Sequence, residues 1–213
     1  MIFSLLVSYI ADLKQNELFF NLGVSLVSGS LVAIFVFVIQ NLKDSRQKQG
    51  DDLLKAGIQE AYQNRALNEY DLLVPKANSI DVTGYSLKSF TEQNIDILVD
   101  RAKSKKPIQV RVLIVDPKSE ASRIMEKAEG DAEGTYQNAY DSLMKKIGHI
   151  DGVEIRLLKR PISMMVYRID NVLFTGYYPF TGRSRNAFTL KIIGGWIFKE
   201  LTEDFQQLWK SSE

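Results

Sequence analysis

Residues 161–178 read PISMMVYRIDNVLFTGYY, and this stretch decides how the larger part of the chain folds. Aromatic, β-branched and other apolar side chains dominate residues 163–170 and again residues 172–178, a composition typical of β-strands. The polar pair Asp170-Asn171 stands where the two runs meet. The stretch therefore predicts two consecutive strands.

The segments around this pair alternate between strand-like and helix-like patterns. We expect four more strands, over 79–85, 109–115, 153–159 and 187–193. Helices are expected over 91–104 with Thr91 as the N-cap, over 119–147 with a break at 129–134, and over 196–209. The order β-α-β-α-β-β-β-β-α predicts an α/β domain with a mixed sheet over residues 76–213.

Composition excludes several classes of chemistry. The chain has 213 residues, no cysteine and a single histidine, His149. Disulfides, thiolate metal sites and mechanisms that need two histidines in one chain are therefore excluded, and we expect no metal and no cofactor. The 27 basic and 26 acidic residues nearly balance, so no stable binding of DNA or RNA is expected.

The first 42 residues differ from the rest and are expected to lie in a membrane. Residues 19–39 carry no charge and, as a helix, would span roughly 30 Å, about one hydrocarbon core. The alternative is an unusually apolar buried helix. Residues 2–10 form a second, shorter apolar run, which is a short first span, an interfacial helix or one arm of a hairpin. Lys43, Arg46 and Lys48 follow the longer run and place the remainder in the cytoplasm.

A linker is expected over residues 43–75. Apolar residues recur at helical spacing among many charges over 41–63, which predicts a juxtamembrane helix with Gly50 and Gly57 as weak points. The helix would serve as a spacer or would transmit a conformational change.

Residues 78–210 resemble one half of a phospholipase D-like fold. Three segments carry the resemblance: IDVTGYSL at 80–87, PIQVRVLIVDP at 107–117 and the strand pair at 161–178. Active members of that family carry H-x-K-x4-D on the strand pair, followed by a glycine and a small hydroxyl residue. In this register Ser163 occupies the histidine position and Met165 the lysine position, whereas Asp170 and Gly176 are retained.

These replacements predict that the chain is not an enzyme. The family's histidine attacks phosphorus, and its lysine neutralises the charge that develops on the phosphoryl oxygens. Serine does not replace the imidazole without a neighbouring base, and methionine carries no charge. Asp170 is then expected to be structural, pairing with an arginine or capping a turn. A divergent phosphodiesterase that uses Ser163 is the alternative.

The same region predicts a site for a phosphate-containing ligand. Residues 156–191 hold seven basic residues and one acid, Asp170, with tyrosines among them. Arginine binds phosphate in a bidentate manner, and tyrosine stacks on bases. The alternative is a solvated basic face that attracts anionic lipid headgroups. The expected ligand-binding residues are Tyr85, Ser86, Lys88, Arg160, Ser163, Met165, Arg168, Tyr177, Tyr178, Arg183, Ser184 and Arg185.

The order of segments is also similar to the two-transmembrane effectors of bacterial anti-phage defence, including the Panoptes type, in which a cyclic nucleotide holds the effector off. The resemblance implies an inner-membrane effector with a cytoplasmic domain that binds a cyclic nucleotide such as a cyclic dinucleotide. A single half-domain implies a homo-oligomer. The alternative is a membrane-tethered scaffold that binds a partner protein or anionic lipid.

Overall fold

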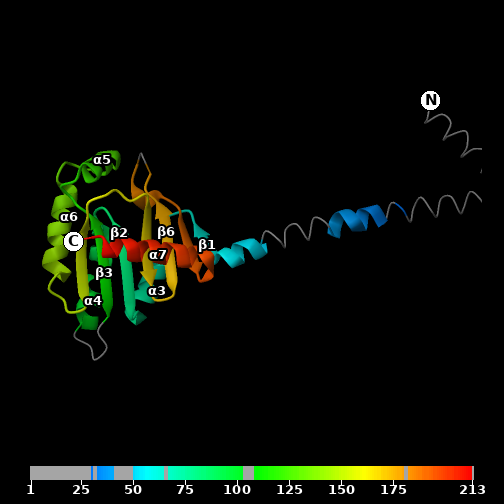
Figure 1. The fold of residues 1–213 in the computed structure, drawn as a ribbon, viewed down its shortest axis with the longest axis horizontal. Helices are drawn as coiled ribbons and strands as arrows, with labels where there is room; N and C mark the ends of the chain where they lie inside the picture. The colour runs from blue at the N-terminus through cyan, green and yellow to red at the C-terminus, as the bar shows by residue number, and fades with distance from the viewer. Residues whose placement is uncertain are drawn as a thin grey trace, which may run out of the picture. The chain divides into compact units, whose positions relative to one another are not determined.

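The computed structural model describes residues 30, 33–40, 50–64, 67–102, 108–179 and 182–212. The chain divides into two compact units, Met1–Asp52 and Leu53–Glu213, which are treated separately below. Figure 1 shows the second unit as a sheet with helices on both of its faces.

In the first unit, residues 33–40 form a helix whose apolar side chains are exposed, including Ile34, Phe35 and Phe37. None of the helices within the described ranges combines the length and the apolarity that a membrane crossing requires. The expected segment 2–10 and most of the segment 19–39 lie outside the described residues.

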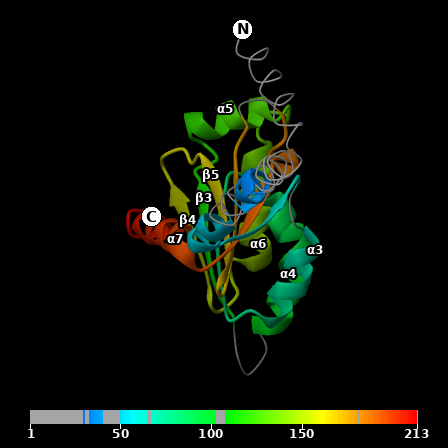
Figure 2. The same ribbon diagram turned by 90° about the vertical axis from the view of Figure 1, so that its right-hand side faces the viewer.

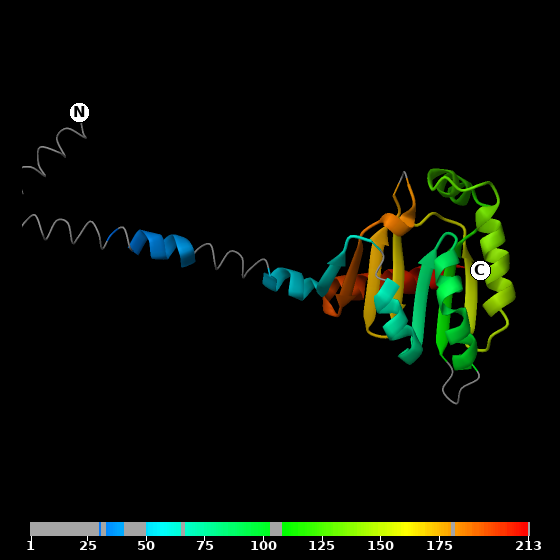
Figure 3. The ribbon, with the colours of Figure 1, turned by 180° about the vertical axis from the view of Figure 1, so that it is seen from behind.

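The second unit is built on a seven-stranded mixed sheet with the order β1-β7-β6-β5-β2-β3-β4. Strand β2 lies in its interior, parallel to β3 and antiparallel to β5. The parallel strands β2, β3 and β4 therefore form one half, and the antiparallel strands β5, β6, β7 and β1 form the other (Figure 3). The strands are β1 (Ile58–Tyr62), β2 (Ser79–Gly84), β3 (Gln109–Val115), β4 (Val153–Leu158), β5 (Met164–Ile169), β6 (Val172–Tyr177) and β7 (Thr189–Ile193).

Helices cover both faces of this sheet, as Figure 2 shows with the sheet seen nearly edge-on. On one face, α3 (Leu67–Leu73), α4 (Lys88–Ala102) and α6 (Thr135–Ile147) enclose the larger apolar core. On the other face, α7 (Gly195–Lys210) covers a smaller core that contains Phe205 and Trp209. Helix α5 (Glu120–Ala128) precedes α6 in the chain, and a short non-helical break separates the two helices. The expected α/β architecture with a mixed sheet is thus confirmed.

The expected helix over 41–63 is wrong in its second half. The helical residues end at Ala56, and Ile58–Tyr62 form the edge strand β1 instead. Gly57 has a φ of +87°, and a Cβ atom there would lie 1.9 Å from the carbonyl oxygen of Gly194. A left-handed conformation ends an α-helix, so Gly57 turns the chain into the sheet.

The expected N-cap at Thr91 is also wrong, because α4 already begins at Lys88. The Thr91 hydroxyl donates to the carbonyl oxygen of Leu87 at 3.1 Å, one turn back along the helix. Threonine forms this bond inside a helix as readily as it caps one, which explains the misplaced start.

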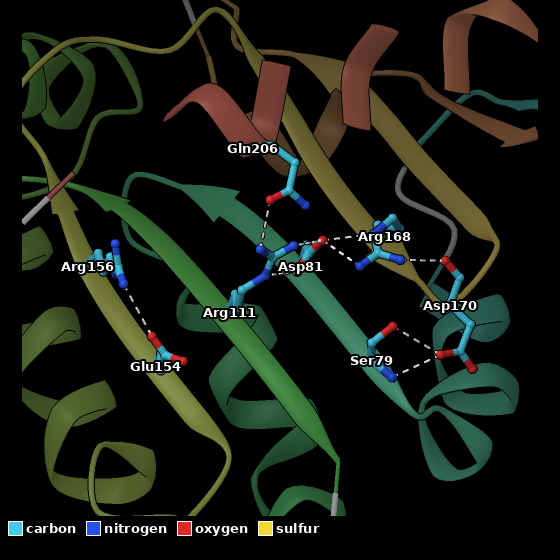
Figure 4. A network of polar contacts seen from close by, with 8 residues as sticks. All are labelled: Ser79, Asp81, Arg111, Glu154, Arg156, Arg168, Asp170 and Gln206. Carbon is cyan, nitrogen blue, oxygen red and sulfur yellow. Dashed lines mark hydrogen bonds and ion pairs between the residues drawn. The ribbon is translucent and has the colours of Figure 1, made fainter. Parts of the chain in front are cut away.

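One buried carboxylate joins the two halves of the sheet (Figure 4). Asp81 on β2 is only 2% exposed and lies directly opposite Arg111 on β3 and Arg168 on β5. Its Oδ1 atom accepts from Arg111 Nε at 2.7 Å, and its Oδ2 atom accepts from Arg168 Nε at 2.8 Å. Arg111 also donates to Gln206 on α7 at 3.0 Å, so the network fastens that helix to the sheet.

Replacement of Asp81 by asparagine should lower the free energy of unfolding by about 3 kcal/mol, because two largely buried guanidinium groups lose their counter-charge. Urea unfolding of the full chain in detergent, followed by tryptophan fluorescence, measures this loss. The control is Glu120→Gln, which breaks the exposed pair with Arg123 and should have a much smaller effect. Equal losses in the two variants would contradict the assigned role of Asp81.

Candidate functional site

A cavity of about 230 Å³ opens at the carboxyl end of β2, on the face that α4 and α6 cover. Most of its lining comes from the β2–α4 turn with the first turns of α4, the α5–α6 connection with the start of α6, β5, and the chain after β6; Tyr70 of α3 and Val82 of β2 complete it. Ligands of open α/β sheets bind in the crevice beyond the carboxyl ends of the parallel strands. This cavity occupies that position.

Tyrosine rings form its apolar walls. Tyr85 and Tyr178 pack edge to face with ring centroids 5.0 Å apart, and Tyr136 lies 6.2 Å from Tyr85. The Tyr85 hydroxyl donates to the carbonyl oxygen of Ile162 at 3.0 Å, which fixes the ring. Burial raises the pKa of Tyr85 and of Tyr136, and Glu129 and Asp131 raise the pKa of Tyr136 further. Tyr85 and Tyr136 therefore stay neutral at physiological pH.

The charges around the cavity are balanced. Its basic side chains come from the start of α4 and from the loop 182–186, and its acidic side chains come from α4 and the α5–α6 connection. The six groups are Lys88, Arg183 and Arg185, and Glu92, Glu129 and Asp131. The site is thus suited to a ligand that carries both an anionic group and hydrogen-bond donors.

The loop that supplies the two arginines is held against the end of α5. The Ser184 amide donates to Glu129 Oε1 at 3.0 Å, and the Gly182 amide donates to the Ala128 carbonyl oxygen at 3.0 Å. These bonds join segments that are more than 50 residues apart in the sequence. They fix the loop at the rim of the cavity.

A second carboxylate, Glu126 on α5, fixes the start of α6. Glu126 is 5% exposed, and its oxygens accept from the amides of Gly134 at 3.0 Å and Tyr136 at 2.7 Å. A carboxylate at this position satisfies amides of the first turn of α6 and complements the helix dipole. It thereby positions Tyr136 in the cavity wall.

Asn94 on α4 brings an unused acceptor to the cavity lining. The residue is 1% exposed, and its Nδ2 donates to the Phe90 carbonyl oxygen at 2.9 Å. Its Oδ1 atom has no hydrogen-bond partner within the described part of the chain. Buried acceptors are normally paired, and the Asn94 side chain interacts with the Tyr167 hydroxyl in the same lining, so its Oδ1 atom can accept from this hydroxyl or from a donor group of a ligand.

Eight of the twelve expected ligand-binding residues line this cavity. They reach it from β2, α4, β5 and the loop after β6, although they are far apart in the sequence. They are Tyr85, Ser86, Lys88, Met165, Tyr178, Arg183, Ser184 and Arg185.

The other four lie elsewhere. Arg168 pairs with Asp81 on the α7 face, and Arg160 donates to Ser211 Oγ at 3.3 Å. Tyr177 packs against Phe188 with ring centroids 5.2 Å apart, also on the α7 face, because neighbouring residues of a strand point to opposite faces. Ser163 is exposed, and its carbonyl oxygen accepts from the Tyr178 amide.

The basic stretch 156–191 is therefore not one surface. Arg156 lies over the Trp209 ring at 4.3 Å and donates to the Trp209 carbonyl oxygen. Lys191 pairs with Glu69 at 2.7 Å. Of the seven basic side chains, only Arg183 and Arg185 line the cavity.

Sequence reasoning missed the contributions of α4 and of the α5–α6 connection. Asn94, Glu129, Asp131 and Tyr136 are among the lining residues that it did not identify. The one available signal was the expected helix break at 129–134, since acidic residues beside such a break often cap the following helix.

The positions matched to the H-x-K-x4-D pattern lie at both ends of strand β5. Met165, 7% exposed, lines the cavity. Asp170 lies at the other end of β5, where its carboxylate accepts from the amides of Asn78 and Ser79 and its carbonyl oxygen accepts from Arg168. His149 follows the last turn of α6, whereas the first turn of α6 lines the cavity; thirteen helical residues separate these ends by roughly 20 Å.

Over the ranges that the structure describes, no cluster of acidic residues or histidine is arranged to hold a metal ion.

No protein-family model and no curated protein matches the sequence. Among solved structures, the chain is similar to NucT from Helicobacter pylori, with a TM-score of 0.45, 14% identity, and 69% of this chain and 89% of that chain covered. For the phospholipase D family member Nuc from Salmonella typhimurium, the TM-score is 0.43, the identity 15%, and the coverage 72% of this chain and 95% of that chain. For the archaeal chromatin protein TrmBL2, the TM-score is 0.45, the identity is 12%, and the coverage is 85% of this chain and 68% of that chain.

Replacement of Glu129 by alanine should release the loop 182–186, which we call the arginine loop, because the Ser184 amide loses its hydrogen-bond partner. We expect trypsin to cleave after Arg183 or Arg185 roughly fivefold faster, the effect of losing about 1 kcal/mol. Limited proteolysis of the full chain with mass spectrometry measures this rate. Glu133→Ala, which removes an exposed acid from the same connection, is the control and should leave the rate unchanged; identical rates in both variants would contradict the assigned contact.

Proposed function

We propose that the cavity binds a phosphate-containing signal, a cyclic nucleotide, and that the bound ligand controls an N-terminal segment that disrupts the membrane in anti-phage defence. The observation that carries this proposal is the meeting of two loop arginines, a lysine at the start of a helix and three tyrosine rings around one cavity. Each of these groups recognises a different part of a nucleotide.

The phosphate is assigned to the basic side chains of the cavity lining, Lys88, Arg183 and Arg185. Guanidinium groups bind phosphate oxygens in a bidentate manner. The chain at Ser86–Ser89 adds the start of α4, a helix of 15 residues, where backbone amides and the helix dipole favour an anion. Three cations and a helix terminus together support binding of one phosphodiester group.

The base is assigned to the tyrosine walls. Tyr85, Tyr136 and Tyr178 offer ring faces or edges for stacking, and Asn94 Oδ1 and Asp131 are acceptors for base N–H groups. The cavity of about 230 Å³ is smaller than the roughly 300–1,000 Å³ typical of drug-sized ligands. It therefore suits one nucleotide unit, with the remainder of a larger ligand at the open mouth.

The membrane half of the proposal rests on the first 48 residues. Residues 19–39 are uncharged, the described part of this segment is helical with exposed apolar side chains, and basic residues follow it. This pattern supports an inner-membrane anchor with the sheet domain in the cytoplasm. The phospholipase D-like pattern of 78–210 supports a homo-oligomer, because single halves of that fold pair to build one centre.

We further propose that the chain does not hydrolyse phosphodiesters. Ser163 is exposed, Met165 faces the cavity without a charge, and the only histidine lies at the far end of α6. The positions that correspond to the motif's histidine and lysine therefore supply neither a nucleophile paired with a base nor a cation to attack or bind phosphorus. Turnover of a generic phosphodiester or of phospholipids by the purified full chain would contradict this part of the proposal.

Reversal of charge at Arg183 tests the ligand site. Arg183→Glu should weaken binding of a cyclic nucleotide at least about tenfold, because charge-assisted hydrogen bonds to phosphate are lost and repulsion replaces them. Calorimetry on the full chain in detergent, with a panel of cyclic mono- and dinucleotides, measures the affinity.

The control is Lys145→Glu, an exposed lysine in the last turn of α6. Equal losses in the two variants would mean that binding reflects general charge, as expected of a scaffold for anionic lipid. Absence of binding to every nucleotide of the panel by the unaltered chain would overturn the proposed function.

A further inference from the structure

The end of the sheet opposite the cavity carries a tight joint between two helices. Gly57 follows the helical residues 50–56, and its carbonyl oxygen accepts a hydrogen bond from the Ile193 amide at 2.8 Å. A Cβ atom on Gly195, the first residue of α7, would lie 2.4 Å from the Gly57 nitrogen. The chain thus enters the sheet domain in direct backbone contact with the start of α7.

Three large apolar side chains around this joint are exposed. Trp196, the residue after Gly195, is 59% exposed, whereas Trp209 near the end of the same helix is 8% exposed. Leu53 and Leu54 lie one turn before Gly57 and are 52% and 62% exposed. We call Leu53, Leu54 and Trp196 the joint patch.

We propose that the joint patch inserts into the interfacial layer of a phospholipid bilayer. The proposal rests on the membrane attachment proposed above. The uncharged segment ends at Ile39, and the joint patch begins at Leu53, so a fully extended tether between them reaches at most about 50 Å. Tryptophan prefers the membrane–water interface, where its ring is buried and its indole N–H stays hydrated.

The charges near the joint favour an apolar contact over an electrostatic one. In the sequence of the two segments that meet there, 50–56 and 194–200, Asp51, Asp52 and Glu200 outnumber Lys55 and Lys199, so these segments carry no excess of positive charge that would attract anionic headgroups. The joint patch therefore binds the bilayer through its apolar side chains, and zwitterionic lipid is sufficient for this insertion.

This contact would fix the direction in which the cavity opens. Strand β1 begins at the joint, and its last residue, Tyr62, pairs with Thr189, at the end of the sheet where β2 leads into the cavity. With the joint patch at the bilayer, the cavity opens away from the membrane. A ligand dissolved in the cytoplasm then reaches it without crossing the lipid surface.

The chain contains only two tryptophans, which allows a direct test. The full chain, Trp196→Phe and Trp209→Phe are reconstituted into phosphatidylcholine liposomes with and without brominated acyl chains. In the unaltered chain and in Trp209→Phe, bromine should quench roughly half of the Trp196 emission, and raised salt should not restore it. In Trp196→Phe the buried Trp209 should not be quenched.

Equal Trp196 emission in both lipids, or quenching that salt abolishes, would overturn the insertion. Extraction of the same liposomes with alkaline carbonate separates this failure from that of the anchor. A chain that stays in the lipid but shows no quenching contradicts the joint patch alone. A chain that carbonate removes contradicts the proposed membrane attachment and the insertion with it.

Discussion

The sheet domain depends on the charge of Asp81. This carboxylate lies on the interior strand at which the parallel and antiparallel halves of the sheet meet, and it binds one arginine from each half (Figure 4). Its burial is tolerated because two guanidinium groups compensate the lost hydration. Through Arg111 and Gln206 the same network also holds α7 on the sheet.

The cavity follows from this arrangement. Strand β2 ends at Gly84, so its alignment with β3 and β5 places Tyr85 and the start of α4 opposite the α5–α6 connection. Glu126 then fixes the start of α6 and Glu129 fixes the loop 182–186, each through a backbone amide. The acidic groups that balance the charge of the site are partly structural, and the cations that face the cavity remain for a ligand. A phosphate group with a base attached fits this distribution of charges better than an isolated anion does.

The sequence predicts the sheet better than it predicts the site. Local composition identifies β2 to β7 and the break between α5 and α6, since these depend on neighbouring residues. It misses β1, because the turn at Gly57 lies against the distant Gly194–Gly195 segment, a close backbone approach that local composition does not reveal. Arg156 and Arg168 resemble ligand-binding residues in the sequence, yet the pleat points them to the α7 face, where Trp209 and Asp81 occupy them. Glu129 and Asn94 join the cavity through tertiary contacts that no local pattern encodes.

On the function proposed above, a cyclic nucleotide binds in the cavity between α4, α6 and the loop 182–186. Amide hydrogen exchange of the full chain, measured by mass spectrometry with and without the nucleotide, is the decisive test. We expect slower exchange at the start of α4, over 129–136 and over 182–186, and unchanged exchange over 156–160. Protection over 156–160, or no protection in any of the cavity segments, would contradict it.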